Sequence, residues 1–158
     1  MAIKRLFVAN RGEIAVRINH AAKALGITTI QAYSEADKEM MAVRLADEAV
    51  CVGPAVARES YLNIGKMVAA ALEAGADAVH PGYGFLSESP EFARAVENAG
   101  MIFIGPSADT IERMGDKVAA RQTAEAAGVP VVPGSKGRVE SVDQAVEVAA
   151  KVGYPVMI

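Results

Sequence analysis

One loop carries the residue types in this sequence that are best suited to binding a small ligand. It reads His80-Pro81-Gly82-Tyr83-Gly84-Phe85-Leu86-Ser87-Glu88. Its two glycines let the backbone approach a ligand closely, Tyr83 offers a flat ring with a hydroxyl, and Glu88 could place a charge at the same rim. The same residues also suit a structural loop in which His80 satisfies a buried backbone group. The residues alone leave both interpretations open.

A lysine forms the second candidate site. Lys117 follows Gly115-Asp116 at the predicted start of a helix. Backbone N–H groups at a helix start and a neighbouring ammonium can together attract a phosphate, although a lone lysine there is also compatible with an ordinary solvated side chain. The pattern G-x-x-x-x-G-K-[ST] does not occur in the sequence, so a P-loop is excluded.

The turn Asn10-Arg11-Gly12-Glu13 follows the first predicted strand. It has a single glycine where a dinucleotide-binding turn has three in G-x-G-x-x-G spacing, which gives dinucleotide binding little support. We interpret Arg11 and Glu13 as a polar turn with an acidic residue well placed in the first turn of a helix. No paired carboxylates, metal-ligand spacing or Ser/His/Asp arrangement is apparent, so no catalytic or metal-binding residue is predicted.

Strands and helices alternate along the first part of the sequence. The predicted strands are 6–9, 27–32, 49–52, 78–79 and 101–104, and the main helices between them cover 14–25, 63–74 and 90–100. Ser89 is a predicted N-cap before Pro90, and Ser107 caps a helix that ends near Met114. Such alternation predicts a mostly parallel sheet covered on both faces, because right-handed crossovers require it. We therefore expect an α/β, Rossmann-like layer with the loop 80–88 at its ligand-binding edge.

A second unit is predicted from Gly115 onward. A helix over 117–127 ends before Gly128, and Ser141 caps another helix that ends at Gly153. The segment 154–158 then reads as the beginning of a strand.

Composition restricts the partners and the compartment. The 158 residues carry a net charge of −3 from 16 basic and 19 acidic side chains without a basic block, which argues against nucleic acid as a partner. No segment approaches the roughly 18 to 20 apolar residues needed to cross a bilayer, so no membrane contact is expected. Cys51 is the only cysteine and lies in an apolar run, which predicts a small buried side chain in a protein of the reducing cytoplasm.

Several motifs, occurring together in this order, resemble the biotin carboxylase family. They are Val8 to Ala15, Leu45 to Ala49, Ser60 to Asn63, His80 to Glu88, Phe103 to Pro106 and Met114 to Lys117. The resemblance spans essentially all 158 residues. It implies that residues 1–114 form the Rossmann-like pre-ATP-grasp domain of a biotin carboxylase and that residues 115–158 begin an ATP-grasp domain.

The resemblance also implies an activity. In the family, ATP and bicarbonate give carboxyphosphate, and biotin on a carrier domain or protein is then carboxylated, while magnesium or manganese neutralises the phosphates. A carboxyltransferase domain or subunit is the further partner. By the same analogy, Lys117 contacts ATP. Tyr83, Gly84 and Glu88 lie at the rim of the site where biotin and bicarbonate react.

Other interpretations remain beside this one. The family's glycine-rich ATP loop, metal-binding glutamates and bicarbonate-binding cations belong to later sequence, so we expect the fragment alone to be inactive. His20 and Ala24 stand where bacterial members that dimerise through this helix carry charged residues, which argues against that dimer contact and leaves other homo-oligomers open. The alternatives are another ATP-grasp ligase, as in carbamoyl-phosphate or purine synthesis, and a free-standing nucleotide-binding or interaction module.

Overall fold

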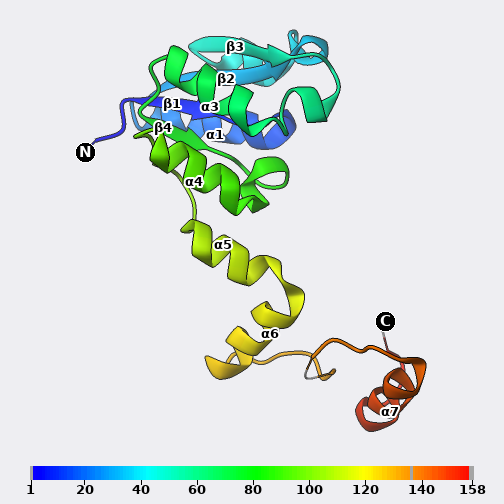
Figure 1. Ribbon diagram of the computed structural model, residues 1–158. Helices are drawn as coiled ribbons and strands as arrows, with labels where there is room; N and C mark the ends of the chain where they lie inside the picture. The colour runs from blue at the N-terminus through cyan, green and yellow to red at the C-terminus, as the bar shows by residue number, and fades with distance from the viewer. Residues whose placement is uncertain (1, 136, 157–158) are drawn as a thin grey trace. The chain divides into compact units, whose positions relative to one another are not determined.

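A computed structural model describes residues 2–135 and 137–156, except for the side chain of Lys117 (Figure 1). The chain divides into two compact units, Met1–Glu112 and Arg113–Ile158. The first unit contains the strands β1 (Arg5–Val8), β2 (Thr28–Ser34), β3 (Glu48–Gly53), β4 (Ala78–His80) and β5 (Ile102–Phe103). Its helices are α1 (Gly12–Ala24), α2 (Met41–Leu45), α3 (Ile64–Glu73), α4 (Pro90–Asn98) and α5 (Ala108–Gly115), which continues into the second unit, and the short 3₁₀ helices η1 (Glu35–Asp37), η2 (Ala57–Glu59) and η3 (Phe85–Glu88).

The five strands form one parallel sheet in the order β3-β2-β1-β4-β5. The central strand β1 pairs with β2 on one side, where Leu6 lies opposite Thr29, and with β4 on the other, where Leu6 lies opposite Ala78. The strand order therefore reverses direction between β1 and β4. In open α/β sheets, ligands bind at the carboxyl edge beside such a reversal.

Helices cover both faces of the sheet, which confirms the predicted α/β layer (Figure 1). Successive side chains of a strand point to opposite faces, so Leu6 and Val8 pack with α1 and α2 while Phe7 packs with α3 and α4. The α3 and α4 side holds the larger buried cluster, in which the rings of Phe92 and Phe103 meet edge to face at 6.1 Å.

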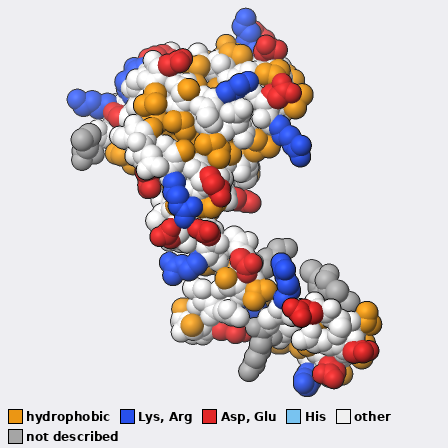
Figure 2. All heavy atoms as spheres, in the orientation of Figure 1, with side chains coloured by type: hydrophobic (Ala, Val, Ile, Leu, Met, Phe, Trp, Pro, Cys, Tyr) orange, Lys and Arg blue, Asp and Glu red, His pale blue; other side chains and the backbone are white. Residues whose placement is uncertain are grey.

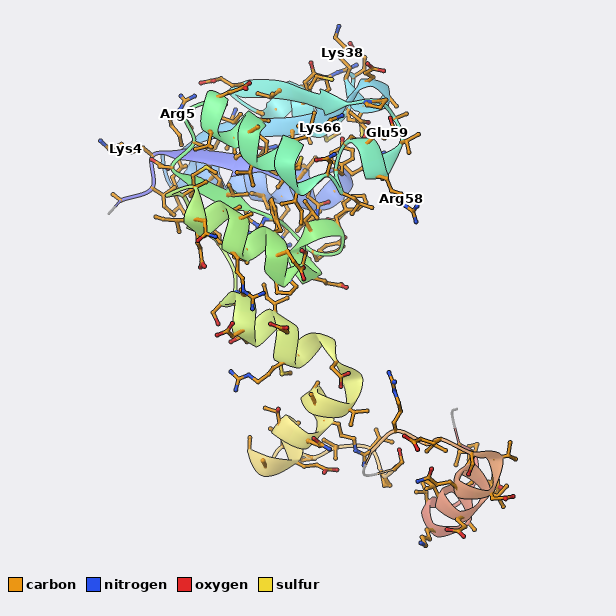
Figure 3. The ribbon with its side chains drawn as sticks, viewed as in Figure 1. Lys4, Arg5, Lys38, Arg58, Glu59 and Lys66 are labelled. Atoms are coloured by element: carbon orange, nitrogen blue, oxygen red, sulfur yellow. The ribbon has the colours of Figure 1, made fainter. Side chains whose placement is uncertain are left out.

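Polar contacts tie the amino edge of the sheet to its neighbours. Asp77 accepts hydrogen bonds from the backbone N–H groups of Lys4, at 3.0 Å, and Arg5, also at 3.0 Å. The guanidinium of Arg5, whose side chain is labelled in Figure 3, donates to the carbonyls of Ala74 and Gly75, just past the end of α3, and pairs with Glu48 of β3. The loops that carry the predicted site lie at the opposite, carboxyl edge of the sheet.

The second unit contains the helices α6 (Lys117–Ala126) and α7 (Val142–Val152). As predicted, Ser141 caps α7 by accepting from the N–H of Gln144 at 3.2 Å, and Ser89 caps α4 in the same way. The strand expected over 154–158 is not formed by residues 154–156, because they pair with no described strand, and residues 157 and 158 lie outside the described residues.

The prediction that Cys51 is buried is wrong. Its side chain is exposed on β3, which is an edge strand of the sheet. An apolar run in an edge strand need not be covered on both faces, whereas the run in the central strand β1 is.

A buried carboxylate joins three segments near the carboxyl edge. Asp37 accepts two hydrogen bonds from Arg11, both at 2.8 Å, one from the hydroxyl of Tyr61 at 2.7 Å and one from Ser34 at 3.0 Å. The Arg11 guanidinium, more than the other partners, holds the pKa of Asp37 below its ordinary value. Burial, reinforced by the bond to Asp37, raises the pKa of Tyr61 to about 12. The tyrosine therefore stays a hydrogen-bond donor throughout the neutral pH range.

Replacing Tyr61 by phenylalanine tests this network. The hydroxyl also accepts from the backbone N–H of Ser34 at 2.9 Å, so Tyr61→Phe leaves a buried donor without its partner and Asp37 with one bond fewer. We expect the free energy of unfolding in urea to fall by about 1 to 3 kcal/mol. Tyr33→Phe is the matched control, since among the described residues its hydroxyl has no hydrogen bond, and equal effects of the two changes would contradict the assignment.

Candidate functional site

Two loops meet at the carboxyl edge where the strand order reverses. One follows β1 and contains Asn10 to Gly12, and the other follows β4 and contains Pro81 to Gly84. The N–H of Ala9 donates to the carbonyl of His80 at 2.9 Å, so the two loops leave paired strands side by side. The predicted loop therefore lies where an α/β sheet of this order binds ligands.

The side chain of Asn10 holds the second loop. It is only 3% exposed, and its Nδ2 donates to the carbonyls of Pro81 at 2.6 Å and Tyr83 at 2.9 Å. A Cβ atom at Gly82 would come within 2.8 Å of that nitrogen. Glycine is thus required at 82 by a close approach to protein, rather than by a ligand.

Two consecutive residues of the loop have unusual backbone angles. Gly84 has φ 63° and ψ −167°, a region that essentially only glycine occupies, and Phe85 follows with φ 46°. The Phe85 ring stacks on Tyr61 with the ring centres 5.6 Å apart and the planes 10° from parallel. The Asp37 network therefore supports a backbone that would otherwise relax.

His80 has the structural role considered for it from the sequence. Its Nδ1 accepts a hydrogen bond from the N–H of Gly82 at 3.0 Å. Burial lowers the pKa of this imidazole, and only an unprotonated Nδ1 can accept that hydrogen bond. A neutral His80 thus shapes the turn that leads to Tyr83.

Tyr83 projects outward from the loop beside an open depression. Its side chain is 61% exposed, and its hydroxyl donates to Glu13 in the first turn of α1, which raises the pKa of the phenol. The depression has a volume of about 330 Å³, and its walls come from both loops and from α1: Asn10, Arg11, Gly12, Glu13, Ile14, Tyr83, Gly84 and Phe85. Glu88 is exposed at the end of η3 and does not line it.

Lys117 begins α6 in the second unit, and its side chain lies outside the described residues. The carboxylate of Asp116 caps this helix and accepts from the N–H groups of Val118 at 2.9 Å and Ala119 at 2.8 Å. Those two N–H groups are therefore already bonded. A phosphate bound here would depend on the lysine more than on the helix start.

A larger groove of about 550 Å³ lies within the second unit. Its walls are mostly apolar side chains of α7 and of the segments on either side of it, together with Arg121. None of the residues predicted from the sequence to bind a ligand lines this groove. Its size alone therefore does not assign it a function.

Neither a metal site nor a membrane helix is found in the part of the chain that the structure describes. Over residues 2–135 and 137–156, no three His, Cys, Asp or Glu side chains lie close enough together to hold a metal ion. No described helix is long and apolar enough to cross a bilayer. On the face seen in Figure 2, basic and acidic side chains are interspersed around hydrophobic ones.

Sequence reasoning did not find three residues of this edge. Asn10, Glu13 and Phe85 each shape or border the Tyr83 loop, yet Glu13 was interpreted only as an acidic residue of a helix start. The signal in the sequence is that the turn at 10–13 and the loop at 80–88 each follow a predicted strand. Using it would have required knowing that β1 and β4 are neighbours.

Comparisons with known proteins give a consistent family. The family model described as "Biotin carboxylase, N-terminal domain" matches residues 2–111, and the one described as "Carbamoyl-phosphate synthase L chain, ATP binding domain" matches residues 116–158. A biotin carboxylase of Bacillus subtilis is 54% identical over 156 residues, which are 99% of this chain and 35% of that protein. The propionyl-CoA carboxylase alpha chain of Ruegeria pomeroyi is 50% identical over 98% of this chain and 23% of its own length.

A solved structure agrees with these relatives. The biotin carboxylase domain of the 2-oxoglutarate carboxylase of Hydrogenobacter thermophilus, a dimer in complex with MgADP, ADP and bicarbonate, superposes with a TM-score of 0.89 at 46% identity. The match covers 98% of this chain and 34% of that one. The present chain thus spans about a third of the length of the biotin carboxylases it matches.

The backbone of Gly84 gives a stability prediction. We expect Gly84→Ala to lower the free energy of unfolding by about 1 to 3 kcal/mol, because alanine resists the observed φ and ψ although no atom crowds its Cβ. Gly65→Ala, in the helix α3, is the contrast and should stabilise by about 0.5 to 1 kcal/mol. Urea unfolding of both variants measures this, and a loss at Gly65 as large as at Gly84 would refute it.

The lowered pKa of His80 predicts a pH dependence. As the pH falls below about 6.5, His80 becomes protonated in the unfolded chain before it does in the folded protein. The free energy of unfolding should therefore decrease. His80→Asn keeps an acceptor near the position of Nδ1 and cannot titrate, so the variant should lose less stability between pH 7.5 and 5.5. An NMR titration of wild-type His80 that gives a pKa of 6.5 or higher would show the prediction to be wrong.

Proposed function

The chain belongs to the biotin carboxylase family, of which it is the N-terminal part, and we propose that the complete protein carboxylates carrier-bound biotin with ATP and bicarbonate. The reaction passes through carboxyphosphate, and the enzyme is an ATP-dependent ligase. The present chain contributes one wall of the site and is inactive by itself. Its domains are the pre-ATP-grasp domain, residues 1–114, and the beginning of an ATP-grasp domain, residues 115–158.

The joined loops at the strand reversal carry this proposal. Biotin presents a small planar ureido ring with one carbonyl and two N–H groups, which suits a flat aromatic side chain next to exposed backbone. Tyr83 supplies the ring, and Gly84 leaves open space where any other residue would place a Cβ atom. We assign Tyr83 and Gly84 to the biotin side of the reaction, with Glu88 as a charge at the outer rim.

Lys117 serves the nucleotide in this proposal. The relative from Hydrogenobacter thermophilus binds MgADP and bicarbonate, and the family model for an ATP-binding domain begins one residue before this lysine. An ammonium at the start of α6 would contact ATP phosphates while Asp116 fixes the helix start. Magnesium or manganese would neutralise the phosphates. The described residues form no cluster for such an ion, so we assign no metal ligand to them.

The partners are a biotin carboxyl carrier and a carboxyltransferase, as separate proteins or as further domains. The match to a propionyl-CoA carboxylase alpha chain supports an acyl-CoA carboxylase assembly. The structural relative is a dimer, which supports a homo-oligomer, although His20 and Ala24, which are exposed on α1, argue against a contact through that helix. A cytoplasmic location stays a prediction.

The competing functions receive less support. A carbamoyl-phosphate or purine-synthesis ligase shares the ATP-grasp scheme, but the family model that covers the first unit is that of biotin carboxylase. A free-standing interaction module is disfavoured by the same match together with the relatives at 50 to 54% identity.

Lys117→Ala in the complete enzyme tests the nucleotide assignment. We expect KM for ATP to rise about 10- to 100-fold in biotin-dependent ATP cleavage, because a hydrogen-bonded charge contact of about 1.5 to 3 kcal/mol is lost. The thermal unfolding midpoint without nucleotide should stay within about 2 °C of that of the wild type, since a solvated lysine contributes little to stability.

Lys151→Ala, in the last turn of α7, is the matched control and should leave KM for ATP unchanged. An unchanged KM in Lys117→Ala would remove the lysine from the nucleotide site. A wild-type enzyme that cleaves ATP with bicarbonate but never carboxylates biotin would overturn the proposed function itself.

A further inference from the structure

The amide of Asn10 stands between two carbonyl groups that accept hydrogen bonds from its nitrogen. Its Nδ2 has two N–H bonds, and they are directed to the carbonyl oxygens of Pro81 and Tyr83. Its Oδ1 accepts from the N–H of Arg11 at 2.8 Å, which fixes the orientation of the amide. All the hydrogen-bonding capacity that points toward the loop is therefore committed to its backbone.

Few side chains could replace this one. A carboxylate of the same shape would place an oxygen opposite two carbonyl oxygens, and alanine would leave a buried and a partly buried carbonyl without this donor. The loop also approaches the asparagine closely, because a Cβ atom at Gly82 would come within 2.8 Å of the Asn10 Nδ2. The amide of Asn10 thus requires a residue without a side chain at position 82.

A second amide supports the first. The Nε2 of Gln31, in β2, donates to the backbone carbonyl of Asn10 at 2.7 Å, and its Oε1 accepts from the Nδ2 of Asn19 at 3.0 Å. All three amide side chains are 3% exposed or less. Both donors of Asn10 and of Gln31 are used, whereas the Oδ1 of Asn19 has no hydrogen-bond partner among the described residues, and buried hydrogen bonds restrict motion where the groups that form them are satisfied.

We propose that Asn10 is a positioning residue, which holds the Tyr83-Gly84 loop in the one conformation that accepts biotin. The inference rests on the proposed function for its catalytic meaning, but the mechanical part stands on the contacts alone. Asn10 touches no substrate in this assignment, and its effect passes through the backbone carbonyls of Pro81 and Tyr83. The loop after β4 and the turn after β1 then move together.

A particular kinetic pattern follows. Formation of carboxyphosphate uses ATP and bicarbonate, whereas transfer to biotin also needs the loop. A displaced loop should therefore impair the second step and spare the first. General damage to the fold would lower both steps by the same factor.

Asn10→Asp in the complete enzyme is the test. We expect kcat/KM for biotin to fall about 10- to 100-fold, the range set by one or two lost buried hydrogen bonds. Bicarbonate-dependent ATP cleavage without biotin should stay within about twofold of the wild type. In hydrogen exchange followed by mass spectrometry, a peptide covering residues 80–88 should exchange faster than in the wild type.

Asn63→Asp is the matched control. It makes the same change of amide to carboxylate at the N-cap of α3, where aspartate caps as well as asparagine, so neither readout should change. If Asn10→Asp does not fold, Gly82→Ala disturbs the same contact from the loop side and should give the same two effects.

Two results would overturn the inference. One is hydrogen exchange of residues 80–88 that equals that of the wild type in a folded Asn10 variant. The other is a loss of rate by the same factor in ATP cleavage with biotin and in ATP cleavage without it. A wild-type enzyme without biotin carboxylation would instead contradict the proposed function. In that case the exchange measurement still decides whether Asn10 holds the loop.

Discussion

One buried amide, that of Asn10, joins the two loops on which the site depends. The loops follow adjacent parallel strands, and each leads to a different helix. Two hydrogen bonds from a single nitrogen to the carbonyls of Pro81 and Tyr83 connect the loops. The bonds matter because the amide itself is buried: the bond to Pro81 lies away from water, and the bond to Tyr83 is partly buried.

The rest of the carboxyl edge stabilises the same loop from its other end. Arg11 is fixed by the carboxylate of Asp37, which also binds the hydroxyl of Tyr61, and the Tyr61 ring supports Phe85 in a left-handed backbone conformation. A residue with such angles persists only where its surroundings hold it. The Asp37 network thus stabilises the unusual backbone of the Tyr83-Gly84 loop, and it can do so without touching a ligand.

The two units contribute different parts of the proposed chemistry. The first offers a loop with a planar ring and a half-buried glycine beside open space, and the second offers a lysine at the start of a capped helix. Neither contains, in its described residues, a cluster that could hold a metal ion. This division fits a chain that spans about a third of the biotin carboxylases it matches.

Local signals in the sequence determined the elements and the family. Strand and helix positions follow from the spacing of apolar residues, and the caps at Ser89 and Ser141 follow from side chains that bond to N–H groups three residues away. Only the tertiary structure decided that Cys51 lies exposed on an edge strand and that Asn10 donates hydrogen bonds to a loop more than 70 residues away in the sequence. Both depend on which strands are neighbours, and strand order is set by packing across the whole sheet rather than by any local pattern.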